Sequence, residues 1–591
     1  MRADMRTTTC FGRLWAIALT LAAAASATAW SQPVAPEPRS GWIDKSPVTS
    51  RHFMVATANP LATAAGYAIL REGGNAADAA VAVQLVLGLV EPQSSGLGGG
   101  ALLLYRDART HRVTAYDGRE TAPSAARPDR FLDAHGEPLA FYDAVIGGRS
   151  VGIPGTMRLL EAVQRGHGRL RWKQLFAPAI AIAERGFAIS PRLHALVAAD
   201  THWVQPRARS YFLTVDGAPR PVGSLLTNPA YARTLRVLAA RGADALYAGP
   251  IAEDIVRTAD EAPAHRGDLT ARDLADYRAV VRKPVCGGYR GYRVCGFPPP
   301  SSGGIAVLQI LGMLEPYDIA SMGVESFWSV HFMTEAERLA FADRDAWIAD
   351  PAYVPPPPGL LDARYLRRRS MLISPFSSIG YATAGDPRRG VARPQAIGWA
   401  IGATPEFPST SQVSIVDREG NAVSMTTTIE AAFGSHLMTE GGFLLNNELT
   451  DFSFLPAVDG KPVANRVEAG KRPRSSMAPT IVFDRRGRLF AVLGSAGGSL
   501  IINDVAKTLV GVIDWRLDPQ AAIALPNFGS RNGPTELEKD TPVVALAPRL
   551  RAIGHATRSI VDPSGAQAIV HTATGWIGGA DPRREGVVKG D

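Results

Sequence analysis

Cysteine is scarce in this chain, with three residues among 591. The scarcity excludes a disulfide-dense scaffold, and no Cys-x-x-Cys pair is present to form a redox dithiol or a zinc ribbon. The His-Glu-x-x-His motif of zinc metalloproteases is missing too. Because hydrophobic residues make up 46% of the chain and charged residues 20%, a wholly disordered polypeptide is also excluded. The length predicts a large composite fold or several domains.

Concentrated positive charge is also lacking, although the net charge is +8. The basic clusters at 367–369 and 485–486 are short and isolated, and neither carries the interleaved aromatic residues of a nucleic-acid surface. A generally basic soluble surface is the simpler interpretation, and no nucleic-acid partner is predicted.

No apolar run reaches the roughly 20 residues needed to span a bilayer. The uncharged run 14–29 follows three arginines, ends in Ala-Thr-Ala and precedes the Pro-rich stretch 31–38. This arrangement predicts a signal peptide over 1–29, with an uncleaved anchor as the weaker alternative. We expect a periplasmic or secreted protein with no membrane span after signal removal.

Cys286 and Cys295 remain in the expected mature chain, within the sequence VCGGYRGYRVC. The alternation around Arg290-Gly291 predicts a hairpin with a two-residue loop. In that register Cys286 and Cys295 form a non-hydrogen-bonded pair, whose Cα atoms lie about 4.5 Å apart, so a cross-strand disulfide can close. A metal site at this pair is the weaker interpretation because no histidine lies nearby.

Hydrophobic periodicity predicts the following helices: 60–90 with a break at 73–75, 155–165, 172–185, 326–345, and about 501–515. Strands are expected at 101–105, 412–417, 421–429, 480–483 and 489–494, the last four as two hairpins. The glycines at 98–100 lack the Lys-Ser/Thr of a phosphate loop and indicate a close backbone approach instead. The stretch 377–409 has no sustained period and is interpreted as a surface linker. These elements favour a layered α+β or αββα arrangement over a doubly wound nucleotide fold.

Thr410 stands between this linker and the first strand of a hairpin. If the chain were cut between Ser409 and Thr410, the threonine would carry a hydroxyl nucleophile beside a free α-amine. An α-amine titrates near 7.7–8.0, so it can act as a general base at neutral pH. Taken alone, a Ser-Thr-Ser triplet is more often a plain loop.

Motifs along nearly all of the mature chain resemble the γ-glutamyltransferase (γ-glutamyltranspeptidase) family of N-terminal-nucleophile hydrolases. The first half contains NPLATAAGYAILREGGNAADAA, EPQSSGLGGG, YDGRETAP, PPPSSGGI and EAERLAFADRDAWIADP. The most specific motif is STSQVSIVDREGNAVSMTTTIEAAFGS, followed by LLNNELTDFS, KRPRSSMAPT, GSAGGS and GGADPRREG. Their common order is the signal, since no single motif would suffice.

The resemblance implies an α+β fold, a four-layer αββα sandwich formed from a precursor that cuts itself at Ser409–Thr410. A large subunit, 30–409, and a small catalytic subunit, 410–591, would form a heterodimer. Thr410 would be the nucleophile, and Thr428 the threonine whose hydroxyl supports it. Gly497 and Gly498 match the oxyanion hole, and glycine does let backbone N–H groups approach an oxyanion closely.

The resemblance also implies a site for an α-amino acid head group. Arg119 matches the arginine for the α-carboxylate, a role suited to a planar bidentate donor. Ser475 and Ser476 match serines that add hydroxyl donors there. Glu448 and Asp451 match the pair that holds the α-ammonium.

The implied reaction cleaves the γ-glutamyl amide bonds of glutathione and related compounds through a γ-glutamyl-threonine acyl-enzyme. Water, or an amino acid or peptide acceptor, would resolve that intermediate. Neither a metal nor an organic cofactor is implied.

Three features depart from the family pattern. Gln412 stands where many members have histidine. Glu430 replaces a common asparagine at the head-group site, and its carboxylate should favour a cationic head. The stretch between Phe452 and Lys471 is short for a lid-bearing loop and lacks its tyrosine, so we expect hydrolysis to exceed transfer to acceptors.

Two alternatives remain open at this point. One is a glutaryl or cephalosporin acylase of the same fold, whose substrate has no α-amine. Against it, three carboxylates around an absent ammonium would be unpaired and costly. The other is an exported binding homologue without activity, which the survival of all the site residues together argues against.

Overall fold

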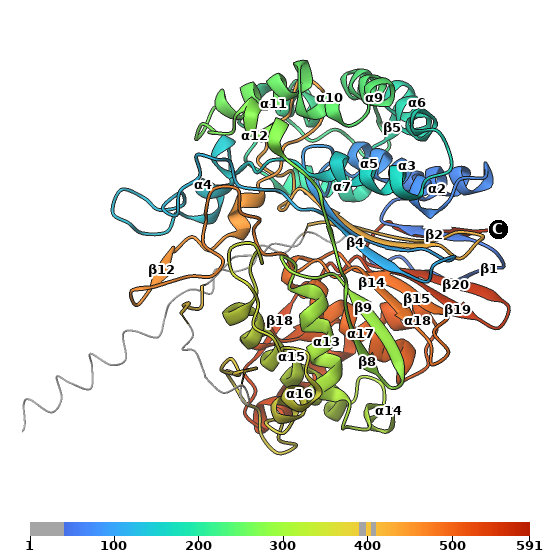
Figure 1. The fold of residues 1–591 in the computed structure, drawn as a ribbon, viewed down its shortest axis with the longest axis vertical. Coiled ribbons are helices and arrows are strands. Elements are labelled where there is room, and N and C mark those ends of the chain that lie inside the picture. The colour runs from blue at the N-terminus through green and yellow to red at the C-terminus, as the bar shows by residue number, and fades with distance from the viewer. Residues whose placement is uncertain (1–40, 389–397, 403–408) are drawn as a thin grey trace, which may run out of the picture. The chain divides into compact units, whose positions relative to one another are not determined.

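The computed structural model describes residues 41–388, 398–402 and 409–591. The predicted signal peptide, and residues 389–397 and 403–408 of the predicted linker, lie outside these residues. Within the described residues two seven-stranded antiparallel sheets form the centre of the fold (Figure 1). The first, the β10 sheet, has this strand order: β21 (Val587–Gly590), β2 (Met54–Thr57), β10 (Ser411–Val416), β11 (Ala422–Thr428), β3 (Gly100–Arg106), β4 (Val113–Gly118), β7 (Val280–Arg282).

The second sheet, the β15 sheet, packs face to face with the β10 sheet. Its strand order is β1 (Val48–Ser50), β20 (Gly575–Ala580), β19 (Gln567–Thr572), β15 (Leu489–Gly494), β14 (Thr480–Phe483), β9 (Tyr292–Gly296), β8 (Val285–Tyr289). Hydrogen bonds join the two sheets, since Ser414 Oγ donates to Gln567 O (3.0 Å) and Ser424 Oγ donates to Leu493 O (2.8 Å).

Alternation along β3 shows how the central strands divide their side chains. Leu102 and Leu104 belong to the apolar core between the sheets and under the second helix layer. Ala101, Leu103 and Tyr105 belong to the core under the first helix layer. Because both faces are covered, the strand has a continuous apolar sequence, as predicted for 101–105.

Helices cover the outer face of each sheet. Against the β10 sheet lie α2 (Pro60–Arg71), α3 (Ala76–Val90) and α5 (Thr156–His167). Against the β15 sheet lie α13 (Gly303–Leu314), α17 (Ile501–Ile513) and α18 (Pro519–Ala524), with α15 (Phe327–Trp347) packed on α13. In Figure 1 the blue-green helices and the yellow-green to orange helices lie on opposite sides of the strands. This is the expected αββα sandwich.

Further helices extend the first layer: α6 (Ala177–Arg185), α7 (Pro191–Ala199), α8 (Pro206–Phe212), α9 (Pro229–Arg241), α10 (Asp244–Tyr247), α11 (Pro250–Asp260) and α12 (Ala271–Asp276). The predicted helix 172–185 begins as a 3₁₀ turn over Trp172–Phe176 and continues as α6. None of the helices in the described ranges is long and apolar enough to cross a membrane.

The predicted break between the first two helices is confirmed. Asn75 caps α3, because its side-chain oxygen accepts hydrogen bonds from Ala77 N and Asp78 N. The Asp78 carboxylate in turn accepts from Asn75 N, which completes a capping box. Gly73 has a φ of +91°, a conformation that favours glycine. The chain therefore turns sharply between α2 and α3.

The structure also forms the expected cysteine hairpin. β8 and β9 pair with Cys286 opposite Cys295, and the two are disulfide-bonded with Cα atoms 4.1 Å apart. Arg290 and Gly291 occupy the loop with φ of +51° and +83°, as a type I′ turn requires.

Candidate active site

Thr410 and Thr428 lie opposite each other at one end of the β10–β11 hairpin. The register pairs Ser411 with Thr427, so the residues immediately beyond face each other across the strands. Thr410 Oγ1 donates a hydrogen bond to Thr428 Oγ1 at 3.3 Å. Thr428 Oγ1 also accepts from Glu430 N at 2.8 Å, which fixes the orientation of the supporting hydroxyl.

The backbone at Thr410 is strained. Its φ is +126°, a region that a β-branched residue rarely occupies and that costs about 1–3 kcal/mol. Neighbouring contacts hold it there, because Arg584 Nη1 donates to Thr410 O (2.9 Å) and Ser409 Oγ donates to Gln93 O (3.0 Å). Strain of this kind at the expected cut site favours breaking the peptide bond.

A small pocket, partly open to solvent, lies beside Thr410. Its walls come from both sides of the expected cut and include all of the predicted catalytic and substrate-binding residues except Gly497. The lining residues are Arg119, Thr410, Thr428, Glu430, Glu448, Asp451, Ser475, Ser476, Met477, Gly498 and Ile501.

Arg119 pairs with two carboxylates at the floor of this pocket. Its Nη1 donates to Glu448 and its Nη2 to Asp451, and Nη2 also donates to Arg474 O at 2.9 Å. Burial disfavours the charged guanidinium, but Glu448 and Asp451 outweigh that cost and raise the pKa of Arg119. Arg119 therefore offsets one of the two negative charges that Glu448 and Asp451 can carry, and leaves room for the positive charge of an ammonium group.

Glu430 adds a third carboxyl group to the pocket. The residue is buried, has a φ of +76°, and accepts hydrogen bonds from Asn447 Nδ2 and, at 3.4 Å, from Thr450 Oγ1. Burial, reinforced by the nearby Asp451 and Glu448, raises the pKa of Glu430 well above its ordinary value. A bound cation would reverse this effect by favouring the carboxylate.

Ser475 forms an isolated parallel β-bridge with Ser301, and Ser476 follows it. Ser475 Oγ accepts from Met477 N at 3.1 Å, so its hydroxyl proton points elsewhere and can donate to a carboxylate. Ser476 Oγ accepts from Arg344 Nη2 at 2.7 Å. Arg344, which also pairs with Asp345 at 2.7 Å, thereby positions the Ser476 hydroxyl where the substrate carboxylate is expected.

Gly497 and Gly498 form the turn between β15 and the helical segment that leads into α17. Their φ values are +145° and +59°, which side chains rarely adopt. Gly498 begins a 3₁₀ turn, Gly498–Leu500, that continues into α17. Backbone N–H groups at such a helix start favour negative charge, as an oxyanion hole requires.

Glu120 is a buried acid of this region that the sequence analysis missed. Its carboxyl group lies beside that of Glu448, and a Cβ on Gly100 would lie 2.2 Å from Oε2. Burial raises the pKa of Glu120 to about 8 against the opposing charge of Arg119. The signal was available, since Glu120 directly follows Arg119 in DGRETAP.

The glycines at 98–100 bring β3 close to the site. A Cβ on Gly98 would meet Leu444 O at 2.1 Å, and one on Gly99 would meet Thr428 O at 2.1 Å. The interpretation as a close backbone approach is confirmed, and the partner is the strand end that carries Thr428.

Two polar residues near the site have structural roles. Residues 148–152 fit the Gly-x-Ser-x-Gly pattern, but Ser150 is buried in a 3₁₀ turn and its Oγ donates to Val145 O at 2.6 Å. Gln412 is also buried, and its Oε1 accepts from Thr426 Oγ1 at 2.7 Å while its Nε2 donates to Ser424 Oγ at 3.1 Å. Gln412 thus fills the space between the sheets with a satisfied amide.

Comparison with known proteins places this geometry in context. The Gamma-glutamyltranspeptidase family model matches residues 62–591. The glutathione hydrolase proenzyme of Bacillus subtilis (strain 168) is 34% identical over 98% of this chain and 99% of its own length. An acylase ACY 1 proenzyme of Pseudomonas sp. (strain V22) is 36% identical over 91% of this chain and 93% of its own length.

The fold has a counterpart among solved structures. Cephalosporin acylase from Bacillus halodurans superposes with a TM-score of 0.80 at 26% identity, covering 93% of this chain and 97% of the acylase. This likeness confirms the N-terminal-nucleophile hydrolase fold. With the family match over residues 62–591 and the sequence relatives, it shows that the chain belongs to the γ-glutamyltranspeptidase family and is an enzyme of that family.

Proposed function

We propose that this enzyme hydrolyses and transfers γ-glutamyl groups from glutathione and related γ-glutamyl amides. The observation that carries the proposal is the pocket beside Thr410, where a threonine pair meets three carboxyl groups and one arginine. Such a pocket offers a nucleophile together with partners for both charges of an α-amino acid head.

Maturation is proposed to begin with Thr410 Oγ attacking the carbonyl carbon of Ser409. The peptide C–N bond breaks, the acyl group moves to oxygen, and water hydrolyses the resulting ester. The products are the Ser409 carboxylate and a free α-amine on Thr410, dividing 30–409 from 410–591. The strained φ of Thr410 supports this step.

Gel electrophoresis under denaturing conditions tests the cut. We expect two bands from the wild type, the smaller beginning at Thr410, and one uncut band from Thr410→Ala. An uncut wild-type chain that persists over days would contradict the maturation step and the assignment of the nucleophile.

In the proposed mechanism the same hydroxyl then attacks the γ-carbonyl carbon of the substrate while the Thr410 α-amine takes its proton. N–H groups at Gly497 and Gly498 stabilise the oxyanion. The tetrahedral intermediate collapses as the amine returns the proton to the leaving nitrogen. Water or an amino acceptor then cleaves the acyl-enzyme and regenerates Thr410.

The head group separates this activity from that of the related acylases. A γ-glutamyl chain carries an α-ammonium for Glu430, Glu448 and Asp451, whereas a glutaryl chain would bring these acids no cation beyond the Arg119 that already pairs with Glu448 and Asp451. We expect kcat/KM to be at least about 100-fold higher for γ-glutamyl-p-nitroanilide than for glutaryl-p-nitroanilide, from the loss of one buried charge pair. Equal or reversed rates would favour the acylase.

Hydrolysis is proposed to exceed transfer because the 452–471 segment is short for a lid-bearing loop. In the structure this segment carries a short hairpin, in which Ala457–Val458 pairs with Lys461–Pro462. Product analysis with excess glycylglycine should yield mainly free glutamate. A dominant transpeptidation product would contradict the proposal.

Export through the predicted signal peptide 1–29 is the proposed route to a periplasmic or extracellular location. Fractionation of cells that produce the full chain should find activity outside the cytoplasm, on a protein without residues 1–29. Full-length activity in the cytoplasm would contradict this route.

A further inference from the structure

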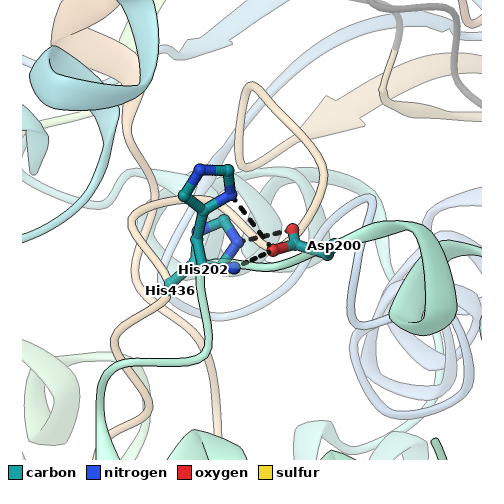
Figure 2. Close-up of side chains that lie close together, drawn as sticks. All are labelled: Asp200, His202 and His436. Carbon is teal, nitrogen blue, oxygen red and sulfur yellow. Dashed lines mark hydrogen bonds and ion pairs between the residues drawn. The ribbon is translucent and has the colours of Figure 1, made fainter.

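Three potential metal ligands converge outside the catalytic pocket. Asp200 ends α7, His202 follows two residues later, and His436 comes from the loop between β11 and the 3₁₀ turn Glu448–Asp451. Figure 2 shows their side chains pointing toward one another. One ligand atom from each lies within 4.8 Å of the others.

The distances fit a cation held by one carboxylate and two imidazoles. His202 Nδ1 lies 3.3 Å from Asp200 Oδ1, and His436 Nε2 lies 2.7 Å from Asp200 Oδ2. Tetrahedral ligands about 2.0–2.1 Å from zinc are separated by roughly 3.3 Å. The two distances run to different oxygens of Asp200, so each oxygen faces one imidazole. The His202 distance equals the value for zinc ligands, and the His436 distance would need a small outward shift.

The hydrogen bond on the far side of His436 identifies the missing partner. His436 Nδ1 lies 3.1 Å from Gly434 O, and a carbonyl oxygen only accepts, so Nδ1 carries a proton. In a neutral ring Nε2 would then present a lone pair to the Asp200 carboxylate. A positive charge must therefore lie between them, either a second proton or a metal ion.

The surroundings of His202 favour the metal. A proton between His436 and Asp200 would account only for the short contact at Asp200 Oδ2. His202 Nδ1 approaches the other oxygen, Oδ1, and a metal ion would account for both contacts. His436 is fully buried, whereas the His202 side chain is 34% exposed, which gives an ion a route in from solvent. Tyr142 stacks on the His202 ring with centroids 4.3 Å apart and holds it in place.

The Gly434 contact is also the outer hydrogen bond that metal-binding histidines usually make. Asp200 is orientated in the same way, since His202 N donates to its Oδ1 at 2.7 Å.

We propose that Asp200, His202 and His436 bind a divalent transition-metal ion, such as Zn²⁺, with solvent completing its coordination. Two imidazoles and one carboxylate suit zinc and its borderline neighbours rather than magnesium or calcium. None of the three lines the pocket at Thr410, so the ion takes no part in the acyl transfer.

An ion at this site would join segments from both sides of Thr410, because Asp200 and His202 precede it and His436 follows it. If the chain is cut as proposed, the ion would cross-link the two subunits. The binding itself requires no cut, so its test is independent of the proposed function.

A second buried group, His331, Glu335 and His555, shows the contrast. There His331 Nε2 contacts Ser374 O (2.8 Å), His331 Nδ1 contacts His555 Nε2 (2.7 Å), and His555 Nδ1 contacts Thr535 Oγ1 (2.7 Å). Each ring nitrogen has a protein partner in a consistent chain of donors and acceptors, so this group needs no ion.

Calorimetric titration of tag-free, chelator-treated protein with ZnCl₂ tests the proposal. We expect the wild type to bind one more equivalent than His202→Ala, or to bind that equivalent at least about 100-fold more tightly, in line with the loss of a metal ligand. His135→Ala is the matched control, because it removes an exposed histidine elsewhere and should titrate as the wild type. Co²⁺ should give a visible ligand-field spectrum in the wild type and His135→Ala only.

Circular dichroism and melting temperature establish that His202→Ala is folded, and His436→Gln provides a second variant that should also lose the equivalent. Any zinc that binds at the Thr410 α-amine would contribute equally to the titrations of all these proteins, so it would not affect the difference between them. Superimposable titrations of the wild type and His202→Ala would overturn the proposal and leave an Asp200–His436 ion pair.

Discussion

At the scale of single residues, two hydroxyl groups, those of Thr410 and Thr428, form the proposed reactive centre. Thr428 Oγ1 accepts hydrogen bonds from both Thr410 Oγ1 and Glu430 N. It therefore links the proposed nucleophile to the backbone of Glu430. We expect Thr428→Val to lower kcat for γ-glutamyl-p-nitroanilide about 10- to 100-fold, the effect of one hydrogen bond to the reacting group, with little change in KM.

Thr427→Val is the matched control for this prediction. Thr427 is an equally buried neighbour on the same strand, but its Oγ1 donates to Gly100 O at 3.2 Å, away from Thr410. This variant should lose some stability and keep its kcat. A kcat within twofold of the wild type for Thr428→Val would remove Thr428 from the mechanism.

Glu120 predicts a pH dependence of stability. Its pKa is raised by burial from 4.5 to about 8, so between these values the folded state holds a proton that the unfolded state has released. The free energy of unfolding contributed by this group is complete below about pH 4.5 and falls as pH rises toward 8. Glu120→Gln removes that decline.

Melting temperatures in a Thr410→Ala background, at pH 5.5 and pH 8, measure this effect on an uncut chain. The drop between the two pH values should be smaller with Glu120→Gln than without it. Parallel drops would mean that Glu120 is ionised in the folded protein.

The sequence predicted which residues line the pocket better than it predicted which of them contact one another. Arg119, Glu448 and Asp451 were expected to bind opposite ends of a substrate, and the structure pairs them with each other. More than 300 positions separate Arg119 from the two acids, so no local pattern reports the contact. The cluster of Asp200 and His436 was missed for the same reason, since a lone histidine in a loop carries no signal.

At the scale of elements, the glycine turn before β3 packs closely against the end of β11. We expect Gly99→Ala to destabilise the protein by about 1–3 kcal/mol or more and to slow maturation, because the new Cβ would lie 2.1 Å from Thr428 O. Gly96→Ala, in the same segment, has only Gly88 Cα at 3.8 Å and should be tolerated. Melting temperature and the fraction cut, measured for both, test the prediction; equal behaviour would contradict it.

Elements specified by nearby residues were predictable. The α2–α3 break, the β10–β11 and β14–β15 hairpins and the start of α17 follow from caps, alternation and turn residues within a few positions. The pairing of β11 with β3 did not follow, because it joins strands more than 300 residues apart and depends on the packing of both faces. The order of strands within each sheet was unpredictable for that reason.

At the scale of the whole molecule, the proposed subunits share both sheets. In the β10 sheet, β10 and β11 lie between β2 and β3, which precede the proposed cut. In the β15 sheet, β14 pairs with β9 from before the cut and β20 pairs with β1. Neither 30–409 nor 410–591 contains all the strands of either seven-stranded sheet, so each depends on the other for its core.

This interleaving predicts that cutting at Ser409–Thr410 does not release the two pieces. Their association rests on strand hydrogen bonds and a shared apolar core, neither of which salt screens appreciably, so 1 M NaCl should not separate them. Size-exclusion chromatography of the cut protein should give one peak with both chains at the elution volume of uncut Thr410→Ala. Denaturant should separate the chains only as the core unfolds, with loss of circular dichroism and activity at one midpoint. A small chain that elutes alone in native buffer would contradict the shared-sheet arrangement.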